Sequence, residues 1–88
     1  MTLRIERRKG RIRLSGEFRF DHLRQLQIEI ERCESPLVLD LEELDLIDLD
    51  GVRFLNACEA KGISVVHCSP YIREWMLQER ARSHPEPL

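Results

Sequence analysis

The hydrophobic and polar residues at the start of the chain alternate with a period of two. Residues 3–6 (LRIE) and residues 11–15 (RIRLS) both show this alternation, and Gly10 lies between them. A period of two is typical of strands with one buried and one solvated face, and a Gly between two such runs favours a tight turn. The pattern predicts a β-hairpin that ends at Gly16.

After the hairpin, apolar residues repeat at helical spacing. One stripe, with spacings of three, four and three, consists of Leu23, Leu26, Ile30 and Cys33. It predicts a helix over about residues 21–33, with Asp21 as its N-cap and Ser35-Pro36 directly after its end. Ile28 lies off the stripe, and we expect it to be an exposed contact.

The middle of the chain predicts one strand and one helix. Residues 37–41 (LVLDL) form an apolar run that is typical of a buried strand, and we expect residues 42–50 to be a connection rich in acids and leucines. A helix then begins at Gly51 and stops at Gly62. Its apolar face holds Val52, Leu55 and Cys58.

The last part of the chain predicts a strand over residues 63–68 and a helix whose first turn holds Pro70. Helical spacing on that helix relates Ile72, Trp75, Met76 and Glu79. We expect Trp75 and Met76 in the core, and a flexible tail over residues 81–88. The order strand, strand, helix, strand, helix, strand, helix predicts one small α/β domain over residues 3–80, with a mixed β-sheet packed against helices.

Composition narrows the class of protein. The 88 residues include 14 basic and 16 acidic side chains, which give a formal net charge of -2 and exclude a uniformly basic nucleic-acid binder. The chain has no apolar run near the roughly 20 residues that cross a bilayer, so we expect no membrane insertion. Its three cysteines include no CxxC pair, which favours thiols in a reducing cytoplasm over a disulfide framework.

Two patterns with metal-binding residue types do not make a site. His67 and Cys68 are neighbours, so on a strand they would point to opposite faces and could not bind one ion together. A calcium loop with Gly51 at its sixth position would place Leu46 first and Ala57 twelfth, where acids are needed. We therefore expect no metal and no other cofactor.

The charges are separated along the chain. Residues 1–20 contain seven basic and two acidic residues, whereas residues 21–60 contain three basic and eleven acidic ones. The basic cluster lies in the hairpin, where charge protects an edge strand from aggregation, and we favour that role over a binding patch. The acids include six in residues 40–52, a segment without a basic residue.

Residues 47–52 (IDLDGV) resemble the first motif of haloacid-dehalogenase-like phosphatases. That resemblance makes Asp48 a nucleophile and Asp50 an acid/base, and Ser69 resembles the second motif. The same chemistry needs a downstream Lys and further acids that hold magnesium, but both lysines precede Ser69. We therefore do not expect phosphatase activity.

Another resemblance covers about residues 3–79. In order and spacing, the chain resembles the STAS domain, the anti-sigma factor antagonist family, through Gly16, Val38-Leu39-Asp40-Leu41, Leu46-Ile47-Asp48, Gly51-Val52, Leu55 and Gly62-Ile63. The resemblance implies a STAS-like fold and a protein-binding module. It also implies that the module docks on a kinase-like anti-sigma factor through the loop at residues 45–53 and the helix that follows.

The chain departs from the family at the phosphorylated serine. Asp50 takes the place of that serine before Gly51, and Leu49 replaces the preceding family serine; residues 37–62 contain no Ser, Thr or Tyr. Phosphorylation, which would add about -1.5 to -2 charge, is therefore not expected here. Asp50 instead has a permanent charge near a helix N-terminus, and two roles stay open for it: a helix cap alone, or part of a partner surface.

The sequence thus predicts a cytoplasmic, bacterial-type, non-enzymatic module for signalling and transcription regulation. The residues expected to bind a regulatory protein such as an anti-sigma factor are Asp48, Leu49, Asp50, Gly51 and Arg53. The alternative within binding modules is a STAS-type accessory subunit of a lipid-transport ATPase. Nucleotide binding, for which the chain has no Gly-rich phosphate loop, stays open, as does a homodimer.

Overall fold

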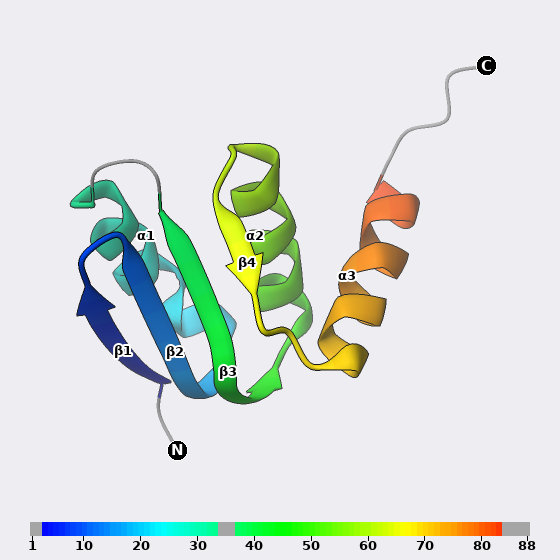
Figure 1. The fold of residues 1–88 in the computed structure, drawn as a ribbon. Coiled ribbons are helices and arrows are strands. Elements are labelled where there is room, and N and C mark those ends of the chain that lie inside the picture. Colours follow the sequence, from blue (N-terminus) through cyan, green and yellow to red (C-terminus); the bar gives the residue numbers. More distant parts are fainter. Residues whose placement is uncertain (1–2, 34–36, 84–88) are drawn as a thin grey trace.

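Four strands form one mixed sheet in the order β1-β2-β3-β4, which is also their order in the chain (Figure 1). The computed structural model describes residues 3–33 and 37–83. The strands are β1 (Leu3–Arg8), β2 (Arg11–Phe18), β3 (Val38–Ile47) and β4 (Ser64–Val66). The helices are the 3-10 helix η1 (Phe20–His22), α1 (Leu23–Glu31), α2 (Leu49–Ala60) and α3 (Pro70–Ser83).

The pairing of the strands confirms the predicted hairpin and fold class. β1 and β2 are antiparallel, and Gly10, with φ of 70°, lies in the turn between them. β3 pairs in parallel with both β2 and β4, because α1 and α2 carry the chain back along the sheet between these strands. Within the described ranges, no helix is long and apolar enough to cross a membrane.

The core lies between the sheet and the helices α1 and α2, which cover the same face, while α3 packs beside α2 (Figure 1). Its fully buried apolar side chains include Ile12, Leu14, Phe18, Leu26, Leu39, Val52, Leu55, Ile72 and Met76. Burial of each such side chain stabilises the fold by about 1.5–3 kcal/mol relative to exposure. The Phe18 and Phe54 rings add an edge-to-face contact, with centroids 5.9 Å apart.

The predicted connection over residues 42–50 is wrong, because β3 continues to Ile47. Two register shifts in the β2–β3 pairing interrupt the two-residue alternation. As a result, the buried positions Leu41, Leu44 and Ile47 recur at every third residue. That spacing resembles neither a regular strand nor a complete helical stripe.

The first helix differs from the prediction at its start. Asp21 lies inside η1, and His22 directly precedes α1, so the prediction of Asp21 as N-cap is wrong. The apolar stripe is confirmed: Leu26 is buried, and its other members pack partly buried against the core. Ile28 is 44% exposed, as predicted. Ser35-Pro36, expected to follow the helix, lies outside the described residues.

The second and third helices keep their predicted faces. The stripe on α2 is buried, although the helix begins at Leu49 rather than at Gly51. Met76 is fully buried and Trp75 is packed against the core, partly buried. Helix α3 reaches Ser83, beyond the start of the predicted tail, and residues 84–88 lie outside the described part.

The three cysteines are free thiols, as expected. Burial raises the pKa of Cys58 to about 11, so this thiol stays protonated and unreactive at neutral pH. Burial also raises the pKa of Cys68.

An ion-pair network joins α2 to α3. The carboxylate of Glu59 accepts hydrogen bonds from Arg73, at 3.2 Å to each oxygen, and from Arg80 at 2.6 Å. Burial alone would raise the pKa of Glu59, but the hydrogen bonds from Arg73 and Arg80 outweigh it and hold the pKa below its ordinary value. Ionised Glu59 therefore stabilises the contact between these helices.

This network predicts a pH-dependent part of the stability. Because the folded-state pKa of Glu59 is lowered, its contribution is complete above the ordinary value near 4.5 and is lost as the pH falls through the folded-state pKa. We expect Glu59→Gln to lower the free energy of unfolding by about 1 kcal/mol at pH 7 and by less at pH 3. Urea unfolding at both pH values measures this, with Glu74→Gln as the control; an equal loss at both would contradict the assignment.

Candidate functional site

The carboxylate of Asp48 joins two elements where β3 ends and α2 begins. Its Oδ1 accepts a hydrogen bond from the Gly51 amide at 2.9 Å, and its Oδ2 accepts one from the Phe20 amide at 2.9 Å. Asp48 has the extended backbone of an N-cap residue, and its own amide donates to the Phe18 carbonyl at 3.2 Å. Asp48 therefore fixes the start of α2 against η1 and the end of β2.

The structure separates the roles of the two neighbouring aspartates. Asp48, not Asp50, is the N-cap of α2, so the interpretation of Asp50 as the cap is wrong. Asp50 lies in the first turn with an exposed side chain. There the positive end of the helix dipole favours its charge without holding the side chain in place. The side chain of Asp50 is therefore open to solvent, whereas both carboxylate oxygens of Asp48 accept backbone hydrogen bonds.

Gly51 is part of the scaffold, because it is buried at the contact between α2 and the end of β3. A Cβ atom at this position would lie 2.7 Å from Ile47 Cγ1 and 3.2 Å from Phe18 Cδ2. No real side chain fits so close to these atoms without a shift. The glycine therefore lets the first turn of α2 approach the sheet, and it presents no side chain to a partner.

Three large apolar side chains are exposed around this junction. Phe20 is 65% exposed, Leu46 is 49% exposed and Leu49 is 38% exposed. They come from η1, the end of β3 and the first turn of α2, and the Phe20 amide is bonded directly to Asp48. We call Phe20, Leu46, Leu49 and Asp50 the junction surface. Exposed apolar side chains at one junction of a fold are typical of surfaces that bind another protein.

The sequence singled out Leu49 and Asp50, included Leu46 only as part of the loop at residues 45–53, and gave no sign of Phe20. Leu46 follows Leu44 at a spacing of two, so a regular strand would place both on the same face. The register shifts in β3 bury Leu44 and expose Leu46. Phe20 is exposed because of its place in η1, and a helix of three residues is too short to show a repeating apolar pattern in the sequence.

Arg53, the remaining residue of the predicted partner site, lies on the exposed side of α2. Its Nε donates to Glu79 Oε1 of α3 at 3.2 Å. The Glu79 carboxylate is almost completely buried, and Arg82 approaches it at 3.7 Å. Arg53 is thus held toward α3, away from the acids at the start of α2.

Two of the three residues of the phosphatase resemblance, Asp48 and Ser69, have structural roles. Both carboxylate oxygens of Asp48 accept backbone hydrogen bonds at the start of α2. Ser69 Oγ accepts a hydrogen bond from the Ile72 amide at 3.3 Å, at the start of α3. Each side chain accepts a hydrogen bond from an amide in the first turn of a helix, where the amides have no partner within the helix.

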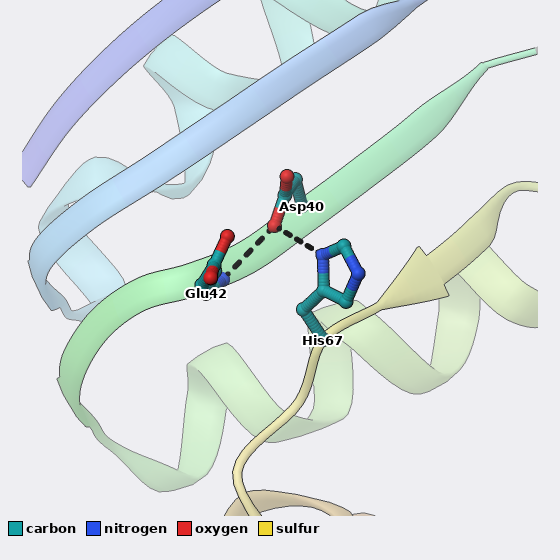
Figure 2. A group of neighbouring side chains, drawn as sticks. All are labelled: Asp40, Glu42 and His67. Carbon is teal, nitrogen blue, oxygen red and sulfur yellow. Dashed lines mark hydrogen bonds and ion pairs between the residues drawn. The ribbon is translucent and has the colours of Figure 1, made fainter.

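A second polar group, on the sheet face that no helix covers, consists of Asp40, Glu42 and His67 (Figure 2). Asp40 Oδ1 accepts a hydrogen bond from the Glu42 amide at 3.0 Å, and it lies 3.0 Å from His67 Nδ1. Burial would raise the pKa of Asp40, but the hydrogen bonds from the Glu42 amide and His67 lower it further than burial raises it. The carboxylate is therefore ionised at neutral pH.

The geometry at Asp48 predicts unequal effects of two neighbouring substitutions. Asp48→Ala removes the acceptor of two backbone amides, and we expect it to lower the free energy of unfolding by about 2 kcal/mol. Asp50→Ala, two residues away, should change it by less than about 0.5 kcal/mol. Urea-unfolding midpoints of the two variants measure the difference, and equal losses would show that Asp48 does not anchor the junction.

The sequence and the fold both match a known domain family. The chain matches the family described as "Mlab, STAS domain" over residues 1–78. It is similar to the structure of the anti-sigma factor antagonist SpoIIAA in its unphosphorylated form, with a TM-score of 0.57 and 15% identity over 94% of this chain and 100% of that one. At that identity, the likeness concerns the fold.

A further similarity is to an uncharacterized protein of the DUF3478 family with a SpoIIAA-like fold, from Shewanella loihica PV-4. The TM-score is 0.47 and the identity 17%, over 96% of this chain and 79% of that one. No curated protein matches. Because the family match extends over residues 1–78 and the mixed sheet has the SpoIIAA-like arrangement, the chain belongs to the STAS domain family.

Proposed function

We propose that the chain is a non-enzymatic binding module of the anti-sigma factor antagonist type, which binds a regulatory protein through the junction surface. The observation that carries this proposal is the exposure of Phe20, Leu46 and Leu49 around one rigid helix start. Burial of large apolar side chains supplies most of the affinity at protein interfaces, and such side chains work best on a fixed scaffold. Asp48 and Gly51 supply that scaffold.

The charges around the junction surface indicate the chemistry of the partner. Asp45 and Asp50 are exposed beside the apolar side chains, and the segment from residue 40 to residue 52 has no basic residue. A partner that offers an apolar pocket with Lys or Arg at its rim complements this arrangement. The acids would speed association and select the partner, while the apolar contacts would hold it.

Binding is constitutive in this proposal. The position that the family uses for a phosphorylated serine is Asp50, and residues 37–62 contain no hydroxyl-bearing side chain. A carboxylate has a fixed single charge, so a kinase cannot switch the junction surface here. Control would then come from the amount of protein or from competition between partners.

Non-enzymatic action is supported by the use of Asp48 as a structural residue. A nucleophilic carboxylate needs a free oxygen and a bound cation for a phosphoryl group, whereas both oxygens of Asp48 accept backbone amides. The three free cysteines support a reducing, cytoplasmic location. We place the protein in signalling that controls transcription.

A second candidate function is that of a STAS-type accessory subunit of a lipid-transport ATPase. The fixed charge at Asp50 favours it, because a permanent subunit needs no phosphorylation switch. The same junction surface would serve both functions. The identity of the bound partner distinguishes them.

Affinity purification with variants of the junction surface tests the proposal. We expect tagged wild-type protein to recover one partner from native lysate, which mass spectrometry identifies as an anti-sigma factor-like protein or an ATPase. Leu49→Asp places a charge in the apolar contact, and Asp50→Lys reverses the rim charge. Each should weaken binding to the purified partner by about tenfold or more in calorimetry.

Ile28→Asp is the matched control, since Ile28 is an equally exposed apolar residue on α1. It should keep wild-type affinity. Circular dichroism and a urea-unfolding curve confirm that all three variants are folded. If the two junction variants bind as tightly as the Ile28 control, the junction surface is not the interface.

A further inference from the structure

We propose that Asp40, Glu42 and His67 form a binding site for a divalent transition-metal cation such as Zn²⁺. Two carboxylates and one imidazole are a donor set that zinc and its neighbours in the first transition row accept. One donor atom from each residue lies within 4.8 Å of the other two. The site is separate from the junction surface and goes beyond the proposed function.

The spacing of the donors suits a single small cation. His67 Nδ1 and Asp40 Oδ1 lie 3.0 Å apart. Two ligands at about 2.0–2.1 Å from a tetrahedral zinc ion lie roughly 3.3 Å from each other. A cation can therefore replace the hydrogen between these atoms with a shift of a few tenths of an ångström. The exposed Glu42 carboxylate lies next to them (Figure 2) and can turn to become the third ligand.

Asp40 has an acceptor atom that the fold leaves unsatisfied. Its side chain is 1% exposed, and no described residue donates a hydrogen bond to Oδ2. A buried ionised oxygen without a hydrogen bond is costly, and natural proteins rarely keep one without a bound ion or a function. This oxygen faces the arginines of β2 rather than Glu42 and His67, and it belongs to the carboxylate that would bind the cation.

Two arginines of β2 face the same carboxylate and set the expected strength of the site. Arg11 and Arg13 lie 3.8 Å and 3.7 Å from Asp40 Oδ2, too far for hydrogen bonds, and both are partly solvated. Glu42 and His67 contact Oδ1 instead. Because the arginine charges oppose a cation but are screened by water, we expect a micromolar rather than a tighter dissociation constant.

The chain brings His67 to this place by an uncommon backbone conformation. His67 has φ of 59° directly after β4, so its ring turns toward β3 (Figure 2). β4 pairs with β3 at three positions only. A cation held by Asp40 and His67 would tie the connection between β4 and α3 to the middle of the sheet, and so add to the stability of this short edge strand.

Calorimetric titration of the tag-free, chelator-treated full chain with ZnCl₂ tests the proposal. We expect one ion per chain, and a rise in Tm of about 7 °C when zinc is at roughly ten times Kd. Glu42→Gln and His67→Ala should each weaken zinc binding by about tenfold or more. Both residues are exposed, so circular dichroism should show folded variants. Arg11→Gln should tighten binding, because it removes an opposing charge.

The matched control is His22→Ala, which removes the other histidine of the described residues; His84→Ala covers the histidine outside them. Both should bind zinc like the wild type. The proposal is overturned if the wild type shows no saturable zinc binding. It is equally overturned if His67→Ala binds unchanged, or if His84→Ala alone abolishes binding.

Discussion

The junction surface depends on the hydrogen bonds that the carboxylate of Asp48 accepts. This carboxylate accepts hydrogen bonds from the backbone amides of Phe20 and Gly51, residues that are far apart in sequence and belong to different elements. These two bonds fix the direction in which the chain leaves β2 and the direction in which it begins α2. Gly51 completes the arrangement, since only a residue without a side chain lets α2 approach Ile47 so closely. The start of α2 is therefore held in place by the fold itself.

Because the start of α2 is fixed, the domain can hold apolar side chains exposed to solvent there. The 15 buried apolar residues of the described ranges form one core, yet Phe20, Leu46 and Leu49 stay outside it. Their exposure is a cost to the isolated chain, which the proposed binding would remove. Asp50, in the first turn of α2, adds an exposed negative charge near them.

Much of the fold was predictable from local patterns, because alternation and helical stripes record which side chains face the core. The hairpin and the buried faces around Leu26 and Leu55 follow from such patterns. The length of β3 was not predictable, since its register shifts arise from pairing with β2. The role of Asp48 and the contact between Asp40 and His67 also depend on distant strands. Side chains 27 residues apart meet only after the parallel sheet has formed.

Amide hydrogen exchange, resolved by NMR in the wild type and in Asp48→Ala, tests the anchoring role of Asp48 most directly. We predict that the Phe20 and Gly51 amides are protected in the wild type. In the variant, both should exchange at least about ten times faster, beyond any change at the central residues Ile12 and Leu39. If Phe20 and Gly51 keep their protection relative to these central amides, Asp48 does not hold the junction together.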